Sequence, residues 1–190
     1  MPKTVLPIIG NILSTILSGV TDSIGGVSDI FYHKGNDFAP HSMTNPTTPS
    51  PYVVTESDFS GPNMGFYVFN GNLSDGDCFN GNTANTAWIK LDLGVGNSKI
   101  CHSYAIFILS LGLDITNSPK SWTLQGSNDD SNWDIISSQS GIIDWISDET
   151  KEFICDTITT PYRYFKMNIT ETVIGSPPLI NELYFYEAVT

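Results

Sequence analysis

The spacing of apolar residues changes once along the chain. Between residues 5 and 31 apolar side chains recur every three or four positions, which is the stripe of an amphipathic helix or a short coiled-coil seam. Pro7 suits the first turn of such a helix, whereas the pair Gly25 and Gly26 can divide it. The stripe consists of Leu6, Ile9, Leu13, Ile16, Val20, Ile24, Val27 and Phe31. We therefore predict a short apolar, helical N-terminal segment over residues 1–32 that anchors or oligomerises the protein.

Residues 33–51 are rich in Pro, Ser, Thr and Asn, which is typical of a linker. Beyond them the apolar period becomes two, with short runs separated by turn residues. Many short strands at this spacing, without a helical pattern between them, indicate an antiparallel sandwich or barrel over residues 52–190. The predicted strands are Tyr52–Thr55, Gly65–Phe69, Ala87–Leu93, His102–Ser110, Ser121–Gly126, Trp133–Ser137, Lys151–Cys155, Tyr162–Ile169 and Glu182–Glu187.

The stretch PKSWTLQGSNDDSNW, residues 119–133, predicts a β-hairpin. Its Asn, Asp and Ser residues favour a turn whose side chains bond their own backbone. Trp122 and Trp133 are then expected to pack in the core or across the strands. A metal site at Asp129 and Asp130 is the alternative, although adjacent carboxylates in a hairpin turn are more often solvated.

The charge balance excludes some classes of partner. Lys and Arg number 8 against 20 Asp and Glu, a net charge of −12. Such a chain repels phosphate backbones and offers no basic stripe, so nucleic acid and anionic membranes are poor partners. No apolar run reaches the ~18–20 residues of a membrane span. The few charges and many Ser, Thr and Asn residues suit a β-rich protein that recognises neutral polar ligands.

No pattern in the chain points to catalysis. We find no nucleophile elbow, phosphate-binding loop, two-histidine metal motif or Cys/His pair, and therefore predict that the protein is not an enzyme. His33 and His41 lie in or beside the linker. Three cysteines match no zinc spacing and are interpreted as small buried hydrophobes, with one disulfide bridge and a spare thiol as the alternative. They are Cys78, Cys101 and Cys155.

Four motifs occur in an order that resembles a known family. They are SPKSWTLQGSNDDSNWDIISSQSG, WIKLDLG, YRYFKMNIT and INELYFYEA. Together they look like the discoidin, or coagulation-factor type C, domain, a group that includes many bacterial and viral carbohydrate-binding modules. The resemblance covers residues 51–188. It implies an eight-stranded antiparallel jelly-roll sandwich of the galactose-binding type. This agrees with the fold predicted from the apolar period of two over residues 52–190.

The resemblance also implies a structural calcium ion. The family often carries one near a Phe-Asp-Gly-Asn-x-x-Thr segment, closed by a Glu in the last strand. The matching segment here is FNGNLSD, so the implied ligands are Asn70, Asn72, Asp75 and Glu182. Asn70 replaces the usual Asp, and Asp75 replaces the usual Thr. The alternative is a Gly-centred loop that needs no ion, with Glu182 solvated or bonded to the backbone.

Family members bind ligands on loops at one end of the sandwich, and sugar sites pair an aromatic platform with a few polar groups. The candidates on such loops are Phe66, Tyr67, Phe79, Asn80 and Trp145. Phe79 is the preferred exposed aromatic, because its neighbours are all turn formers. Trp145 precedes a strand at a position where the family often has a Trp, so we expect it to pack.

These patterns lead to one functional hypothesis and two alternatives. The protein is interpreted as a non-enzymatic attachment or structural protein on the surface of a virus or bacteriophage particle, assembled in the host cytoplasm. Residues 5–31 would contact other structural proteins or copies of itself, and the sandwich would face outward toward a cell-surface glycan. The first alternative is a secreted or surface-attached bacterial carbohydrate-binding module. The second is a decoration or connector protein that binds no sugar.

Overall fold

The computed structural model describes residues 36–73, 77–109, 115–156 and 159–188. The predicted N-terminal segment, residues 1–32, lies outside the described residues, and so does the predicted calcium ligand Asp75. The description below therefore concerns the sandwich and the chain that enters it.

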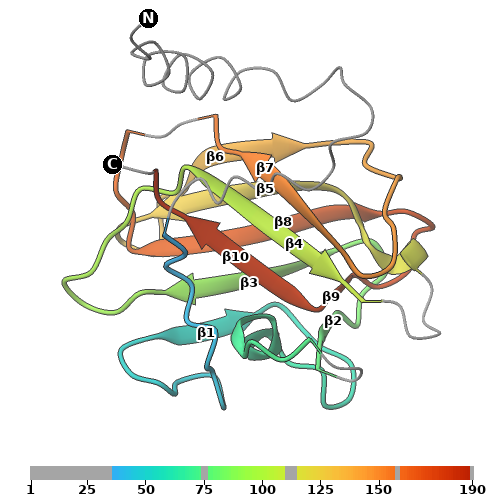
Figure 1. Ribbon diagram of the computed structural model, residues 1–190, viewed down its shortest axis with the longest axis horizontal. Coiled ribbons are helices and arrows are strands. Elements are labelled where there is room, and N and C mark those ends of the chain that lie inside the picture. The colour runs from blue at the N-terminus through green and yellow to red at the C-terminus, as the bar shows by residue number, and fades with distance from the viewer. Residues whose placement is uncertain (1–35, 74–76, 110–114, 157–158, 189–190) are drawn as a thin grey trace, which may run out of the picture. The chain divides into compact units, whose positions relative to one another are not determined.

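Two antiparallel sheets make up the domain (Figure 1). One has five strands in the order β1–β3–β8–β5–β6, and the other has three in the order β10–β4–β7. The short strands β2 and β9 pair with each other. The strands are β1 (Val53–Glu56), β2 (Phe79–Asn80), β3 (Ala87–Asp92), β4 (Ser103–Ile108), β5 (Pro119–Ser127), β6 (Asp134–Gln139), β7 (Glu149–Ile154), β8 (Tyr164–Thr172), β9 (Leu179–Ile180) and β10 (Glu182–Tyr186).

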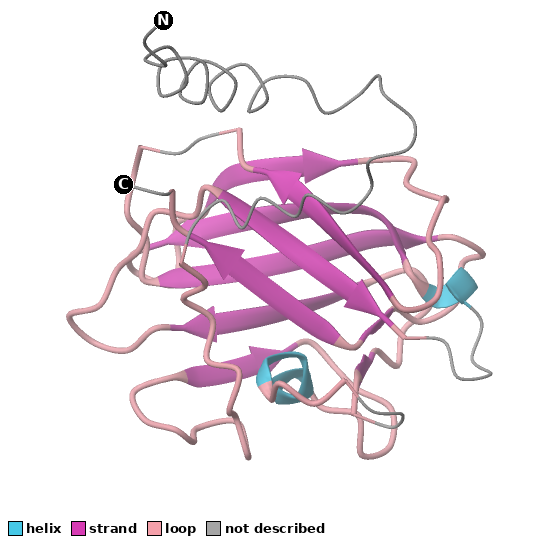
Figure 2. Ribbon diagram, in the orientation of Figure 1, coloured by secondary structure: helices cyan, strands magenta, loops and turns pink. Residues whose placement is uncertain are grey.

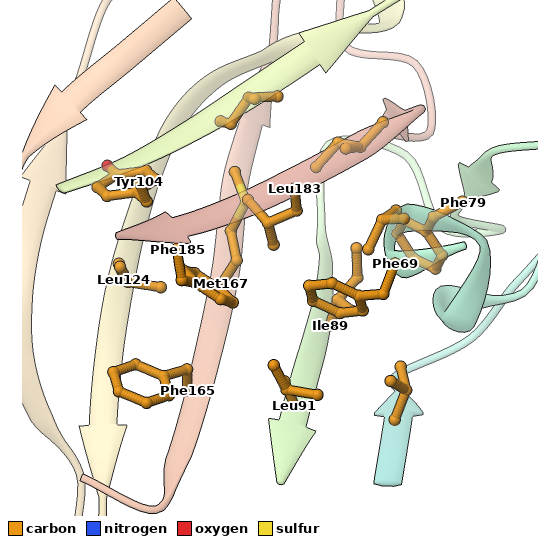
Figure 3. Close-up of a cluster of buried hydrophobic side chains, with 14 of the residues drawn as sticks. Phe69, Phe79, Ile89, Leu91, Tyr104, Leu124, Phe165, Met167, Leu183 and Phe185 are labelled. Atoms are coloured by element: carbon orange, nitrogen blue, oxygen red, sulfur yellow. The ribbon is translucent and has the colours of Figure 1, made fainter. Parts of the chain in front are cut away.

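The core lies between the two larger sheets, as the close-up in Figure 3 shows. In β3 every second residue is buried, beginning with Ala87, and β8 alternates in the same way. Phe165 of β8 meets Phe185 of β10 with ring centroids 5.5 Å apart. The five and three strands thus form the eight-stranded sandwich that the period of two and the family resemblance predicted.

The predicted hairpin is confirmed. Strands β5 and β6 pair antiparallel, and the turn between them is held by the carboxylate of Asp129. Its Oδ1 accepts the backbone N–H of Ser131 at 2.9 Å and of Asn132 at 2.8 Å. These hydrogen bonds hold the pKa of Asp129 well below its usual range. The neighbouring Asp130 pairs with Lys90, so both carboxylates are occupied by protein partners rather than free to hold a metal.

One predicted strand is wrong, and two short strands were missed. Gly65–Phe69 forms a 3-10 helix, η1, rather than a strand (Figure 2). A short apolar run cannot be assigned by periodicity alone, and here Phe66, Val68 and Phe69 are all buried, which no single strand face would allow. The strands β2 and β9 are two residues each, too short to show alternation. A second 3-10 turn, η2, spans Ile115–Asn117.

The three cysteines are buried and form no disulfide bridge, in agreement with their interpretation as small buried hydrophobes. The Sγ atoms of Cys101 and Cys155 are 3.7 Å apart. Burial raises the pKa of the Cys101 thiol well above its ordinary value, which keeps it protonated and unreactive.

Candidate functional site

Trp88 is directed away from the core by the alternation of β3. Its neighbours Ala87 and Ile89 are buried in the sandwich, so the indole lies on the outer face of the five-stranded sheet, where it is half-buried. Two contacts with Ser57, just after β1, fix its backbone. The N–H of Trp88 donates to Ser57 Oγ at 3.0 Å, and its carbonyl accepts the Ser57 N–H at 3.0 Å.

A pocket of roughly 300 Å³ lies beside this indole. It forms where the end of β1 meets the beginning of β3, because these strands run in opposite directions (Figure 1). Asp58 is positioned on its rim by Thr83, whose Oγ1 donates to Asp58 Oδ2 at 2.6 Å. Its lining residues are Ser57, Asp58, Thr83, Thr86, Ala87, Trp88, Asn168, Ile169 and Thr170.

The pocket combines an apolar ring with several converging polar groups. Asn168 of β8 is the direct cross-strand partner of Trp88, and both residues line the pocket. The carboxylate of Asp58 accepts hydrogen bonds, whereas the amide of Asn168 both donates and accepts them. One aromatic surface with a few oriented polar groups is the arrangement that binds a small polar ligand with an apolar face.

A larger hollow of about 470 Å³ lies at the other ends of the same strands. Tyr52, before β1, and Leu93, after β3, contribute to its lining. Its charged groups are already paired, Lys99 with Glu187 at 2.8 Å and Asp37 with His41. We therefore regard the pocket beside Trp88 as the stronger candidate site.

The predicted aromatic platform at Phe79 is wrong. Phe79 is 0% exposed, because the pairing of β2 with β9 places its ring in the core. Phe66 is also buried, and its ring stacks on Tyr67 at a centroid distance of 4.3 Å. Tyr67 is half-buried against the core. None of these three rings lines the pocket beside Trp88.

The other two predicted ligand residues serve the fold. Trp145 is 3% exposed, and its Nε1 donates to the carbonyl of Pro119 at 2.8 Å, so it packs as expected. Asn80 is half-buried, and its backbone carbonyl accepts the N–H of Ser60 at 2.8 Å. Neither residue lines the pocket beside Trp88.

The sequence does contain a pattern that marks Trp88 as a candidate ligand contact, although it was not among the predicted ligand residues. In AWIKLD the inward positions are Ala87, Ile89 and Leu91, which places Trp88 on the solvent face. A large aromatic residue on the polar face of a strand has no core to pack against and is a candidate ligand contact. The predicted loop aromatics Phe66, Phe79 and Trp145 are buried instead.

The described members of the predicted calcium set do come together. Gly71 N–H donates to Oε1 of Glu182 at 2.7 Å, and Asn72 N–H donates to Oδ1 of Asn70 at 2.7 Å. The side-chain amides of Asn70 and Asn72 both donate to Asp77. Oxygen atoms that would face a calcium ion are therefore engaged by N–H donors of the protein.

His41 occupies the remaining side of Glu182. Its Nδ1 lies 3.1 Å from Glu182 Oε2, and its Nε2 lies 2.5 Å from Asp37 Oδ2. Burial lowers the pKa of His41, but the two carboxylates outweigh burial and raise it to about 9. An imidazolium thus supplies positive charge beside Glu182, where it would repel a cation.

The contacts of Asn70, Asn72 and Glu182 are those of a loop held by its own hydrogen bonds, which is the alternative to the calcium ion that the family resemblance implied. No group of three or more His, Cys, Asp or Glu side chains in the described ranges is arranged to hold a metal. Calcium takes six to eight oxygen ligands, and Oδ1 of Asn70 and Oε1 of Glu182 each accept a backbone N–H here. Calcium binding stays a prediction for experiment.

Comparisons with known proteins agree with this architecture. No family model matches the chain, and no curated protein matches it. Among solved structures, the family 32 carbohydrate-binding module of Clostridium perfringens NanJ, in complex with galactose, superimposes with a TM-score of 0.58. It is 14% identical, covering 78% of this chain and 97% of that one. This chain has the fold of a family 32 carbohydrate-binding module.

Two further modules with this fold support the assignment. The family 32 module of Streptococcus pneumoniae EndoD has a TM-score of 0.59 at 13% identity, covering 80% of this chain and 99% of that one. CpGH89CBM32-5 of Clostridium perfringens, in complex with GalNAc-β-1,3-galactose, has a TM-score of 0.57 at 17% identity, covering 71% and 94%. Among the residues described, no helix is long and apolar enough to cross a membrane.

Proposed function

We propose that this protein binds a glycan in the pocket beside Trp88, without altering it chemically. The observation that carries the proposal is the indole of Trp88 on the outer sheet face, beside a pocket with a carboxylate, an amide and hydroxyl groups. Modules with the same fold bound to galactose and to GalNAc-β-1,3-galactose support it.

Each group has a part in binding. The indole of Trp88 packs on the apolar C–H face of a pyranose, which removes apolar surface from water. Asp58 accepts hydrogen bonds from sugar hydroxyls, and the hydrogen bond from Thr83 orients it beforehand. Asn168 donates to one sugar oxygen and accepts from another. Such contacts retain a sugar without breaking a bond, because the binding step transfers no proton and forms no covalent link.

A glycan array tests this proposal. We expect the full-length protein to bind a defined set of glycans, and Trp88→Ala and Asp58→Asn to reduce that binding by at least tenfold. Phe59→Ala is the matched control, because Phe59 is 38% exposed and follows Asp58 in the chain but does not line the pocket. Loss of binding in Phe59→Ala with no loss in Trp88→Ala would place the platform elsewhere. Complete silence of the protein on the array would favour the connector role.

We further propose that the domain is displayed on a virus or bacteriophage particle and is attached through residues 5–31. The apolar stripe in the sequence supports this placement, since an amphipathic segment gains stability by packing on a partner. Mass spectrometry of the native protein tests it. An intact N-terminus in purified particles is expected, whereas a cleaved N-terminus in a secreted fraction would favour the bacterial module.

A further inference from the structure

Two lysines face each other beside the pocket. Lys90 of β3 and Lys166 of β8 are direct cross-strand partners on the outer face of the five-stranded sheet. Like charges at such a position repel and destabilise a sheet. The chain has 8 Lys and Arg residues against 20 Asp and Glu, so two adjacent lysines are unexpected in a chain with so few basic residues.

The two lysines differ in what neutralises them. Lys90 Nζ lies 2.7 Å from Asp130 Oδ2 in an ion pair. Lys166 Nζ lies 3.9 Å from the ring centroid of Trp133, and no carboxylate pairs with it in the part of the chain that the structure describes. Burial and the charge of Lys90 lower the pKa of Lys166, and the more distant carboxylate of Asp130 offsets only part of this. Lys166 is therefore the lysine of this pair that no carboxylate of the described ranges contacts directly.

The lysine pair lies next to the proposed sugar platform. Along β3 and β8 it is the next outward pair after Trp88 and Asn168. Residues two apart in a strand are separated by roughly 6.5–7 Å, so a ligand longer than one sugar unit reaches both pairs. The acidic side chains near this surface are engaged, since Asp130 holds Lys90 and Asp92 holds Arg163 at 2.6 Å. Asp58 lines the pocket beside Trp88, whereas neither lysine does.

We infer that the glycan bound at Trp88 is acidic, with a carboxylate or sulfate held between Lys90 and Lys166. The inference rests on the proposed glycan-binding function and names the class of sugar. The ammonium group of Lys166 has three N–H donors, so it contacts an anion while it remains over the ring of Trp133. An anion here also relieves the repulsion between the lysines. This differs from the neutral polar ligands that the few charges and the many Ser, Thr and Asn residues suggested.

The experiment compares matched pairs of polysaccharides by affinity gel electrophoresis of the full-length protein. Polygalacturonate and its fully methyl-esterified form share a backbone and differ in the carboxylate. Dextran sulfate and dextran differ in the sulfate. We expect at least one anionic polymer to bind about tenfold tighter than its neutral form, as a charge-assisted hydrogen bond predicts. That preference should fall as salt is raised from 0.05 to about 0.5 M.

Three variants assign the preference to its residue. Lys166→Gln should bind the acidic and neutral polymers equally, and Lys166→Arg should keep the preference because it keeps the charge. Lys151→Gln is the control, since it removes the same charge from β7 of the other sheet. If Lys166→Arg keeps the preference while Lys166→Gln loses it, the positive charge recognises the anion. If both variants lose it, Lys166 serves only to support the ring of Trp133.

The outcomes separate this inference from the proposed function. Equal binding of every acidic and neutral pair overturns the inference, and so does an unchanged preference in Lys166→Gln. If the glycan array finds neutral ligands that depend on Trp88, the proposed function survives that failure. If Trp88→Ala changes no binding at all, both fail. Preference for dextran sulfate without preference for polygalacturonate identifies sulfate as the anion recognised.

Discussion

Glu182 is a fully buried carboxylate whose charge is supported by its immediate neighbours. Burial raises its pKa, which reflects the cost of removing a charge from water. A backbone N–H from Gly71 and the imidazole of His41 offset that cost. The Gly71 hydrogen bond agrees with the alternative of a loop that needs no ion. The partner His41 was not predicted, because linker residues give no indication of which strand they will cover.

His41 makes the stability of the domain depend on pH. Its pKa of about 9 lies above its ordinary value of 6.5, so its ion pairs contribute stability that is complete below about pH 6.5 and is lost as the pH rises through 9. We expect His41→Gln to lower the free energy of unfolding by about 2–3 kcal/mol at pH 6.5 and much less at pH 9.5.

Urea unfolding from pH 6 to 10 measures this difference. His102→Gln is the control, since Nδ1 of His102 has no hydrogen-bond partner among the described residues. A gap between wild type and His41→Gln that is constant with pH would contradict the account.

Calcium gives a second prediction at the same residues. Because protein donors and His41 surround Glu182, we expect excess calcium at pH 7 to leave the melting temperature unchanged within about 1 °C. Differential scanning fluorimetry with calcium and with a chelator measures it. A rise of several degrees that Glu182→Ala abolishes would show that the ion binds after all.

The two sheets are joined through a buried chain of hydrogen bonds. Trp122 Nε1 of β5 donates to the hydroxyl of Tyr104 in β4 at 2.8 Å, and that hydroxyl lies 3.2 Å from Ser137 Oγ of β6. The motif SWTLQG thus contributes a polar contact as well as core area. Burial raises the pKa of Tyr104, so its hydroxyl remains protonated.

The predictability of each element follows its length. Strands such as β3 and β8 are long enough for alternation to mark their buried faces, so their existence was predicted from sequence. The helix η1 has five residues and is buried on several sides, which hides its type. The pocket beside Trp88 combines residues of β3 and β8 with Ser57, Asp58, Thr83 and Thr86 from the adjoining loops, whose positions alternation does not predict.

Removing the Tyr104 hydroxyl tests the link between the sheets. Tyr104→Phe leaves the N–H of Trp122 buried without a partner, and we expect a loss of about 1–3 kcal/mol in the free energy of unfolding. Tyr184→Phe in β10 is the control, since Tyr184 is half-buried and lies outside the core cluster. Equal effects of the two changes in urea unfolding would argue against a special role for this hydrogen bond.

Across the whole molecule, most of the hydrophobic core could be predicted from the sequence, whereas the distribution of charge around the candidate site could not. The core cluster of described residues begins at Phe38, inside the predicted linker, and is completed by the strands that follow, which the period of two predicted. The site was less predictable. The net charge is a sum over the whole chain, so it does not reveal a local pair of like charges such as Lys90 and Lys166. Pairing between strands distant in sequence brings such residues together, and a single sequence does not specify that register.

Deleting residues 1–31 tests the division of the chain. Since the core cluster of described residues starts at Phe38, we expect a folded, monomeric sandwich whose melting temperature lies within about 3 °C of the full-length protein. Calorimetry and light scattering measure the two properties. Unfolding of the truncated protein would mean that the N-terminal segment belongs to the same core.

The central claim is that the outer sheet face at Trp88 binds glycan. The most direct measurement is glycan-array binding of the full-length protein beside its Trp88→Ala variant, with matched melting temperatures confirming that both are folded. The account predicts a defined set of bound glycans whose signal falls at least tenfold in the variant. Equal glycan binding by the wild type and Trp88→Ala would contradict it.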